Sequence, residues 1–318
     1  MPEKGLLLLE NGIVIEGEAA GAPTTAIGEL CFNTANYGYE EVFTDPSYYG
    51  QILIMTTPHV GNYGVSRIER ESDKIQIMGL VANSISPYFS RPIQSAISLD
   101  EWFKNNNKPI LWNVDTRALV KSIRSQGTLN CAISTDGTPP DKLLDMVRKH
   151  PQMTGLELAS FVSTKESYYY EGNTGAPLII VIDYGVKRSI LRELRKSGAC
   201  VYVVNCFTPV NEILNMEPAG IVLSNGPGDP SAMPYAIDTA KTLIEKTDIP
   251  LLGICLGFQI ICLALGAKTY KLKFGHRGVN HPVLDKKTGK AYITSQNHGF
   301  AVNYDDFRRI SGFSIRFI

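Results

Sequence analysis

From Leu178 onward, short apolar runs alternate with segments whose apolar residues recur at helical spacing. The first run, residues 178–182, is entirely apolar, as is typical of a strand covered on both faces. This alternation predicts an α/β domain with an open, parallel central sheet, in which ligands bind beyond the carboxyl ends of the strands. The predicted strands cover residues 178–182, 201–204, 220–223 and 250–252, and the predicted helices include residues 190–194, 210–216, 235–246 and 256–265.

The N-terminal half has shorter elements and many turn residues, which predicts a mixed α/β domain. Two apolar stretches flank Asn11-Gly12, a strong hairpin signal over residues 6–16. Further strands are predicted at residues 51–56 and 75–81, and short helices at residues 99–105 and 117–125.

The segment between these two patterns, residues 155–177, loses periodicity and is rich in Ser, Thr, Tyr and Gly. It is interpreted as a linker. The expected organisation is therefore an N-terminal domain at residues 1–154, the linker, and the open α/β domain at residues 178–318. Two domains suit a chain of 318 residues.

Charge and cysteine usage narrow the classes of partner and compartment. The chain has 31 basic and 31 acidic residues, so no bulk attraction to nucleic acid or to an anionic membrane is expected. The N-terminal run of four leucines is too short for a signal sequence or a membrane span. The six cysteines form no C-x-x-C pair and no cluster with histidine, which indicates reduced thiols in a cytoplasm and no metal site.

One cysteine has a distinctive setting. Gly253, Cys255 and Gly257 form a G-x-C-x-G pattern between a predicted strand and a predicted helix. This is the cysteine version of a nucleophile elbow, in which flanking glycines permit a sharp turn that exposes the thiol. The N-terminus of the following helix favours the nucleophilic thiolate. The alternative is a small core cysteine at a buried strand–helix junction.

A second loop with special chemistry, residues 224–230, follows the predicted strand at 220–223. Its two glycines and two prolines indicate a rigid turn whose backbone N–H groups point outward. If it lies beside Cys255, one of these groups and the N–H of Leu256 could form an oxyanion hole. The alternative is an ordinary Pro/Gly loop.

Taken together, residues 223–230 and 253–257 resemble the class I (triad) glutamine amidotransferases. Residues 273–283 and 295–302 narrow the resemblance to the small, glutaminase subunits of carbamoyl-phosphate synthase. The N-terminal half is similar to the first domain of those subunits in four segments, residues 32–34, 44–48, 58–62 and 115–119.

The resemblance implies that Cys255 attacks the side-chain amide carbon of L-glutamine, giving a γ-glutamyl thioester and ammonia. It also implies that Leu256 and Gly226 supply backbone donors near the oxyanion. The positions that match glutamine-binding residues of the family are Ser47, Gly226, Gly228, Leu256, Gln259, Asn297, Gly299 and Phe300, and His298 matches a site-lining residue. On the residues alone, a turn residue is the preferred interpretation of Ser47, and Asn297 and His298 could equally form a polar hairpin turn.

The chain departs from the family pattern in two places. Phe258 occupies a position where histidine is usual, so altered packing is expected there. The family's general base and its carboxylate partner lie in a His-Pro-Glu run downstream of the segment matched by residues 295–300. The sequence ends at Ile318, in an expected unfinished strand over residues 313–318. His59, His276, His281 and His298 match other family segments, and His150 ends a charged helix. Neither the triad base nor its carboxylate partner is therefore expected in this sequence.

The resemblance implies a heterodimer with a large synthetase subunit, which would use ATP and Mg²⁺ to make carbamoyl phosphate for arginine and pyrimidine synthesis. No cofactor and no metal are expected in this chain itself. A second hypothesis is a subunit that binds glutamine, or only its partner, without hydrolysing it. A third, an unrelated α/β cysteine hydrolase, explains Cys255 but leaves the N-terminal half unexplained.

A glutaminase assay tests the expected lack of a base. The 318 residues alone should turn over glutamine several powers of ten more slowly than an intact relative, because loss of a triad member has effects of that size. Turnover comparable to the relative's would contradict this expectation.

Overall fold

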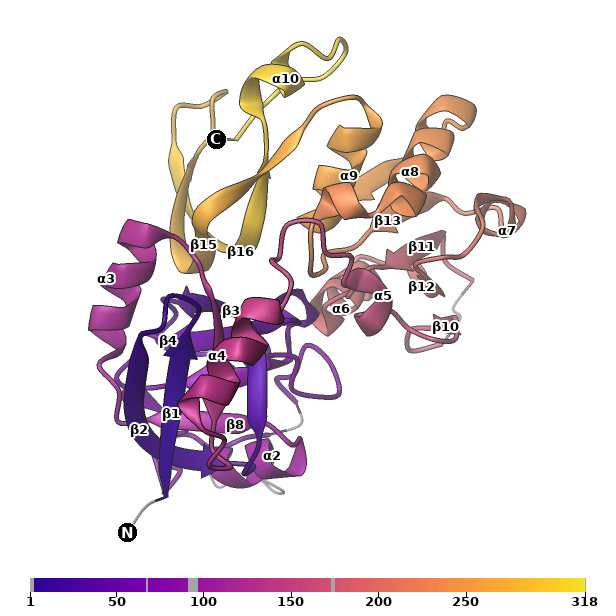
Figure 1. Ribbon diagram of the computed structural model, residues 1–318. Coiled ribbons are helices and arrows are strands. Elements are labelled where there is room, and N and C mark those ends of the chain that lie inside the picture. The colour runs from indigo at the N-terminus through magenta and orange to yellow at the C-terminus, as the bar shows by residue number, and fades with distance from the viewer. Residues whose placement is uncertain (1–2, 67, 91–96, 173–174, 318) are drawn as a thin grey trace. The chain divides into compact units, whose positions relative to one another are not determined.

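The computed structural model describes residues 3–66, 68–90, 97–172 and 175–317, which form two units (Figure 1). Unit 1 consists of Met1–Met153, Lys273–Pro282 and Ile293–Asn297. Unit 2 consists of Thr154–Leu272, Val283–Tyr292 and His298–Ile318. Each unit therefore combines a long continuous stretch with short segments from the C-terminal part of the chain.

Unit 1 is built around a closed barrel with the strand order β1-β2-β8-β6-β4-β3-β9. Strands β3, β4, β6 and β8 pair in parallel in that order, and the other pairs of the barrel are antiparallel. Closure leaves no unpaired strand edge. The strands are β1 (Lys4–Leu9), β2 (Val14–Gly21), β3 (Thr25–Asn33), β4 (Gln51–Met55), β6 (Gly79–Val81), β8 (Pro109–Trp112) and β9 (Asn130–Ser134), and β5 (His59–Val60) pairs separately with β7 (Ser84–Ile85).

The predicted N-terminal hairpin is confirmed, since β1 and β2 pair with Leu8 opposite Val14 and Gly12 in the turn has φ 88°. The strand predicted at residues 51–56 is confirmed as β4. The strand predicted at residues 75–81 is wrong over its first part, because only β6 is extended. Ile75 and Ile77 are nevertheless buried, so their apolar pattern reflects an irregular core segment.

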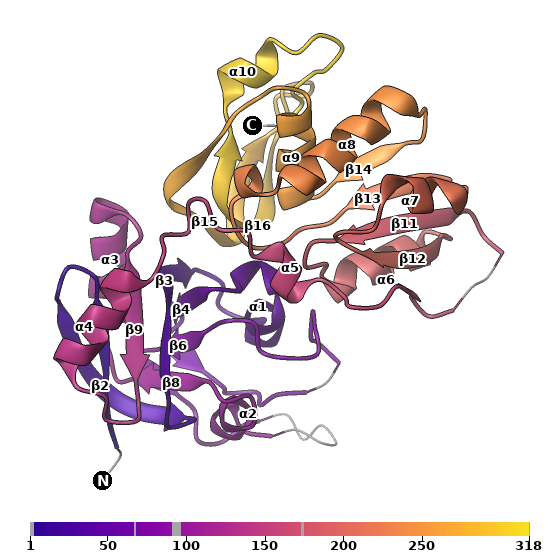
Figure 2. The same ribbon diagram turned by 45° about the vertical axis from the view of Figure 1, so that its right-hand side comes forward.

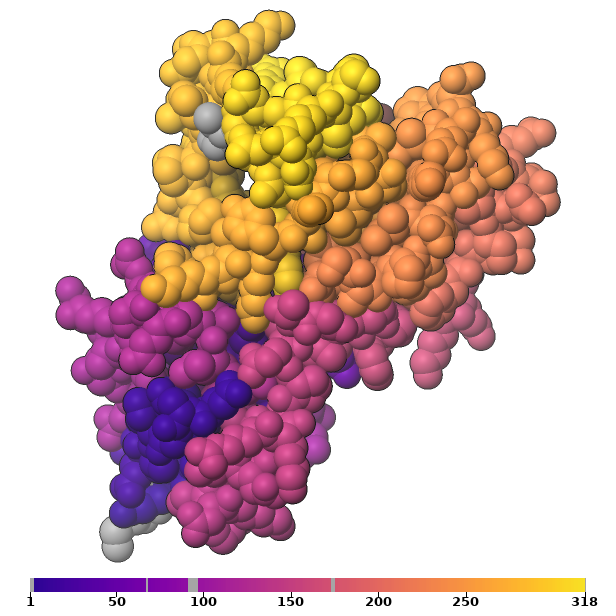
Figure 3. Space-filling view, turned by 45° about the horizontal axis from the view of Figure 1, so that its top comes forward, coloured from indigo at the N-terminus to yellow at the C-terminus, as the bar shows by residue number. Residues whose placement is uncertain are grey.

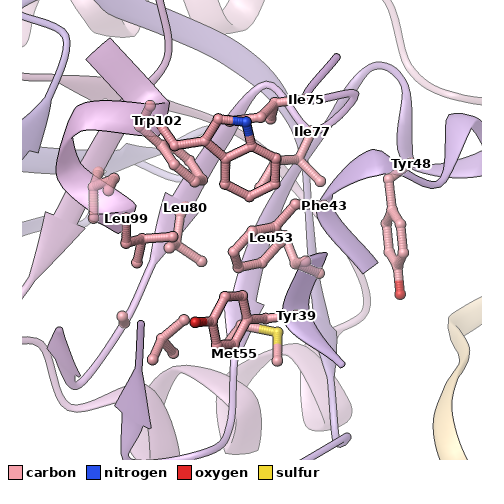
Figure 4. Packing of buried hydrophobic residues seen from close by; sticks show 14 of the residues in the cluster. Tyr39, Phe43, Tyr48, Leu53, Met55, Ile75, Ile77, Leu80, Leu99 and Trp102 are labelled. Atoms are coloured by element: carbon pink, nitrogen blue, oxygen red, sulfur yellow. The ribbon is translucent and has the colours of Figure 1, made fainter. Parts of the chain in front are cut away.

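Helices and a large aromatic core complete unit 1. Phe43 of the first helix packs edge-on against Phe103, with ring centroids 5.5 Å apart, and lies beside Trp102 and Leu53 (Figure 4). Both predicted helices of this half are confirmed, as α2 and α3. The helical elements are α1 (Tyr39–Thr44), the 3₁₀ turn η1 (Pro46–Tyr48), α2 (Leu99–Asn105), α3 (Thr116–Gln126) and α4 (Pro140–Lys149).

Unit 2 contains the predicted parallel sheet, with strand order β10-β12-β11-β13-β14. All its pairs are parallel except that of β10, which is antiparallel to β12. Every element predicted from residue 178 to residue 265 is present, within a few residues at each end. The elements are β10 (Tyr168–Tyr169), β11 (Leu178–Asp183), α6 (Arg188–Lys196), β12 (Cys200–Asn205), α7 (Val210–Asn215), β13 (Gly220–Leu223), η2 (Pro230–Ala232), α8 (Pro234–Lys246), β14 (Leu251–Gly253) and α9 (Leu256–Ala264).

Both faces of this sheet are covered. Ile180 and Ile182 of β11 belong to one core cluster, which also contains residues of α7, α8 and α9 (Figure 2). Val181, which points to the opposite face, packs in a second cluster with Leu191 of α6. Successive side chains of β11 point to opposite faces of the sheet, and each face is covered by a hydrophobic core. This explains why the strand is apolar throughout residues 178–182.

The C-terminal part contains a long two-stranded hairpin, β15 (Thr269–Leu284) and β16 (Ala291–Val302), that the sequence analysis did not predict. Within unit 1, it packs on the barrel. Thr34 N donates to Arg277 O over 3.3 Å, Thr128 N donates to Lys273 O over 3.0 Å, and the Phe32 and Phe274 rings stack with centroids 6.0 Å apart.

Two expectations for the C-terminal segments need correction. Asn297 and His298 lie within β16, so the hairpin-turn reading is wrong. The unfinished strand is wrong over residues 313–317, where Phe317 makes only an isolated bridge to Asp285; Ile318 lies outside the described residues. Residues 313–317 and helix α10 (Tyr304–Arg308), yellow in Figure 3, lie on the surface of unit 2.

The range interpreted as a linker, residues 155–177, contains helix α5 (Ala159–Val162) and β10 among its described residues. Its first part is also anchored, since Glu157 and Gly228 form a β-bridge. Across the described part of the chain, no helix has the length and apolar character required to cross a bilayer.

A buried acid in α1 makes the stability of unit 1 depend on pH. The Glu40 side chain is 1% exposed, its Oε1 accepts from Ser66 N over 2.6 Å, and its Oε2 lies 3.8 Å from Arg70 Nε. Burial raises its pKa from 4.5 to about 7, against the opposing effects of the Ser66 N–H and Arg70. The folded state therefore keeps this proton up to about pH 7, whereas the unfolded chain releases it near pH 4.5. This contribution to stability is full below pH 4.5 and falls as pH rises to about 7.

In the parent chain, the free energy of unfolding of unit 1 should fall by up to about 3 kcal/mol between pH 5 and pH 8 because of Glu40. Glu40→Gln has no such proton to lose, so this part of the pH dependence should disappear in the variant. Urea unfolding followed by tryptophan fluorescence would measure it, because both tryptophans, Trp102 and Trp112, belong to unit 1. The matched control is Glu101→Gln, at an exposed position of α2. An identical pH slope in Glu40→Gln and the parent would contradict the prediction.

Candidate active site

Cys255 lies at the junction between β14 and α9 with φ 53° and ψ −104°. A positive φ is costly for a residue with a side chain and persists only where the surrounding structure holds it. Cys255 occupies the N-cap position of α9, so it lies at the positive end of the helix. This is the elbow conformation that the G-x-C-x-G pattern predicts.

Two glycines make this turn sterically possible. A Cβ added at Gly257 would lie 2.1 Å from the carbonyl oxygen of Leu223, and one added at Gly253 would lie 2.6 Å from Phe258 N. Gly257 N instead donates to Ser224 O over 3.0 Å, and Ile254 N donates to Leu223 O over 3.0 Å. The first turn of α9 therefore packs directly on the end of β13.

The exposure of Cys255 differs from that of the other cysteines. Cys255 is partly exposed, whereas the remaining five are buried. Burial raises the pKa of the Cys206 thiol and brings that of Cys262 to about 12. The core-cysteine reading thus describes the other five, while Cys255 combines access with a helix N-terminus that favours the thiolate.

The loop after β13 forms a hydrogen-bonded frame. Ser224 Oγ accepts from Tyr184 N over 2.9 Å, and Asn225 Nδ2 donates to Gly185 O over 2.8 Å. Ser224 and Asn225 are both buried. Because its buried polar side chains are bonded to backbone, the loop is held rigidly.

The two residues expected to supply the oxyanion-hole donors, Gly226 and Leu256, lie close together. A Cβ at Gly226 would lie 2.1 Å from Tyr184 O and 2.8 Å from Leu256 Cδ2, so this loop approaches the start of α9 closely. Among the hydrogen bonds of the described residues, neither Gly226 N nor Leu256 N has an acceptor. Gly228 has φ 93°, and a Cβ there would lie 2.7 Å from Leu156 O. Glycine is therefore required at both positions of the loop.

Gln259 connects the elbow helix to β16. Its N–H donates to Cys255 O over 3.1 Å, and its Nε2 donates to Phe300 O over 2.6 Å. The same carbonyl is 2.8 Å from His298 Nδ1. Because a carbonyl oxygen only accepts, His298 Nδ1 carries a hydrogen in this contact. Gly299 lies between these two residues, so unit 2 brings most of the predicted site residues together.

Ser47 and Asn297 belong to unit 1, where a residue that the sequence analysis did not select joins them. Asp45 Oδ1 accepts from Ser47 N over 2.9 Å, and its Oδ2 accepts from Asn297 Nδ2 over 2.9 Å. The Asp-Pro-Ser order is a turn signal that could have indicated the first bond. The sequence has no signal for the second, because 252 positions separate the two residues.

Phe258 points outward, with 45% of its surface exposed and its ring centroid 6.2 Å from that of Phe307. The other histidines lie in β5, at the end of α4 and in β15, where the rings of His276 and His281 are 5.4 Å apart. No group of acidic, histidine and cysteine side chains suited to a metal ion occurs in the part of the chain that the structure describes.

Two family models match the chain: the carbamoyl-phosphate synthase small chain, CPSase domain, over residues 7–133, and glutamine amidotransferase class-I over residues 180–314. The carbamoyl phosphate synthase small chain of Methanopyrus kandleri is 46% identical over 309 residues, which cover 96% of this chain and 84% of that one. The small chains of Chlorobaculum tepidum and Thermotoga maritima are each 45% identical, and the matches cover 94% and 96% of this chain and 82% and 78% of theirs.

Selective alkylation tests the elbow. Iodoacetamide added to the native chain should modify Cys255 roughly tenfold or more faster than any other cysteine, because Cys255 alone combines exposure with a helix N-terminus. Peptide mass spectrometry after quenching would locate the label, and Cys255→Ser should remove the fast phase. Equal labelling of Cys255 and Cys262 in the folded chain would contradict the prediction.

Proposed function

Because this chain belongs to the carbamoyl-phosphate synthase small-chain family, we propose that its Cys255 elbow carries out the glutamine-hydrolysing step of that family. The chain is of the glutaminase-subunit type, because an amidotransferase domain follows a small-chain domain in its sequence. The match over residues 7–133 leaves no support for an unrelated cysteine hydrolase, and the family relationship favours hydrolysis over glutamine binding alone.

The observation that carries the proposal is the strained backbone of Cys255 at the start of α9. The Cys255 thiolate adds to the side-chain amide carbon of glutamine, and the carbonyl oxygen becomes an oxyanion. The N–H groups of Gly226 and Leu256 are proposed to receive that charge. Each donor of this kind contributes about 3 kcal/mol of transition-state stabilisation in a site that excludes water.

Collapse of the tetrahedral intermediate breaks the carbon–nitrogen bond. The leaving nitrogen takes a proton from solvent and departs as ammonia, which leaves a γ-glutamyl thioester on Cys255. Water then attacks the thioester carbon, releases glutamate and returns the thiol. The second step uses the same two backbone donors, because the same oxygen again becomes negative.

Glutamine recognition is proposed for two sets of residues. In unit 2, Gln259 holds the carbonyl of Phe300, which fixes the β16 segment that contains Gly299, and His298 bonds to the same carbonyl. Gly228, in the loop after β13, is proposed to contact glutamine by its match to the family pattern. In unit 1, Ser47 and Asn297 are proposed to contact glutamine, by their match to the family pattern.

The partner is proposed to be a large synthetase subunit, which would receive ammonia and supply the ATP and Mg²⁺ sites of a cytoplasmic heterodimer. This chain is proposed to hold no cofactor. The balanced charge of the chain gives no reason to expect a nucleic-acid or membrane partner. The proposed domains remain residues 1–154 and 178–318, with residues 155–177 between them.

Intact mass spectrometry after incubation with glutamine tests the proposal. The chain should gain one γ-glutamyl group, because the thioester forms on Cys255 before water attacks it. Cys255→Ser should show no such adduct and Cys262→Ser, at a buried position of α9, should show the same adduct as the parent. Binding of glutamine by the parent without any adduct would instead support the non-hydrolysing alternative.

A further inference from the structure

We propose that Asp45 is a positioning residue for glutamine binding, which orients Ser47 and Asn297 through its two carboxylate oxygens. The inference rests on the proposed function, in which those two residues contact glutamine. The Asp45 side chain is buried, with 7% of the residue exposed. Its Oδ1 accepts from Ser47 N over 2.9 Å, and its Oδ2 accepts from Asn297 Nδ2 over 2.9 Å.

The bond to Asn297 sets the direction of its amide. A carboxylate only accepts hydrogen bonds, so Asn297 must present Nδ2 to Asp45 and its Oδ1 faces the other way. Glutamine carries N–H donors on both its α-ammonium group and its side-chain amide. The fixed Oδ1 of Asn297 can accept a hydrogen bond from either of them. Asp45 thereby makes Asn297 an acceptor for the ligand, whereas a residue able to donate in place of Asp45 would allow the amide to turn over.

The bond from Ser47 N to Asp45 holds the backbone turn that carries Ser47. It caps η1, in which Tyr48 N donates to Asp45 O over 3.1 Å and Tyr49 N donates to Pro46 O over 3.0 Å. Tyr48 is anchored in the core, and its hydroxyl accepts from Asn33 Nδ2 over 2.8 Å. Because Pro46 and Tyr48, on either side of Ser47, are both buried, the backbone that carries Ser47 is held in place.

A second Asp-Pro-Ser segment in the chain separates capping from positioning. Asp229 caps η2 in the same way, with its Oδ1 accepting from Ser231 N over 2.9 Å. Its Oδ2 accepts from the backbone of Gly155 over 2.9 Å. The turn itself therefore needs only one oxygen, and at Asp45 the second oxygen is directed to a side chain of the proposed site.

The test uses the full chain with Cys255→Ser, so that glutamine is bound and not consumed, and measures the dissociation constant for L-glutamine by titration calorimetry. Asp45→Asn and Asp45→Ser both retain a capping oxygen for Ser47 N but no longer impose one amide orientation on Asn297. Each should weaken glutamine binding about tenfold to a hundredfold, the effect of losing one hydrogen bond to a charged group. The thermal midpoint should remain close to that of the background chain.

Coupling identifies the route of the effect. Asn297→Ala alone should weaken binding, and Asp45→Asn added to it should have a much smaller further effect than in the background chain. The matched control is Asp115→Asn, which changes an exposed cap in the same unit, where Oδ1 accepts from Ala118 N over 2.9 Å, and should leave affinity unchanged.

Unchanged affinity in folded Asp45→Asn and Asp45→Ser, with Asn297→Ala impaired, would overturn the positioning role alone. Fully additive effects of Asp45→Asn and Asn297→Ala would overturn it as well. Unchanged affinity in Asn297→Ala would show that the proposed assignment of Asn297 to glutamine is itself wrong.

Discussion

The active-site geometry depends on the contact between the first turn of α9 and the end of β13. With hydrogen in place of a side chain at Gly257, the backbone of the helix lies against the Leu223 carbonyl, and the strand-to-helix turn closes tightly enough to push Cys255 to a positive φ. The sharp turn at the cysteine and the nearby donors at Gly226 and Leu256 both follow from that close approach. Stability lost to the strained backbone is recovered in the surrounding core and in the buried polar frame of the loop.

That frame shows how a loop at the end of a parallel strand can be rigid. Ser224 and Asn225 bind the backbone that follows β11, so the ends of two neighbouring strands are held together. Gln259 adds a third connection, from α9 to the Phe300 carbonyl of β16. Polar side chains bonded to backbone thus replace apolar packing at the sheet edge where the substrate is proposed to reach the backbone.

Sequence reasoning succeeded where a local pattern has a single physical meaning. A strand buried on both faces must be apolar throughout, which β11 is, and a Gly-x-Cys-x-Gly turn has few other uses. It failed for β15 and β16, whose mostly polar, partly exposed residues lack the alternation of a half-buried strand. It also failed to foresee barrel closure in unit 1, because closure depends on pairing between strands far apart in the chain. Asp45 was missed for the same reason: its turn is local, but its bond to Asn297 is not.

The division of β15 and β16 between the units has a consequence for any attempt to dissect the chain. A fragment that stops at Met153 would lose the strands that cover Thr34, Thr128 and the Phe32 ring, and would expose those groups to solvent. A fragment that starts at Thr154 would carry the same strands without the barrel on which they pack. Cutting the chain at one position therefore cannot give two fragments that each keep all the contacts of their own unit. A fragment that contains one complete unit would have to join segments that are far apart in the sequence.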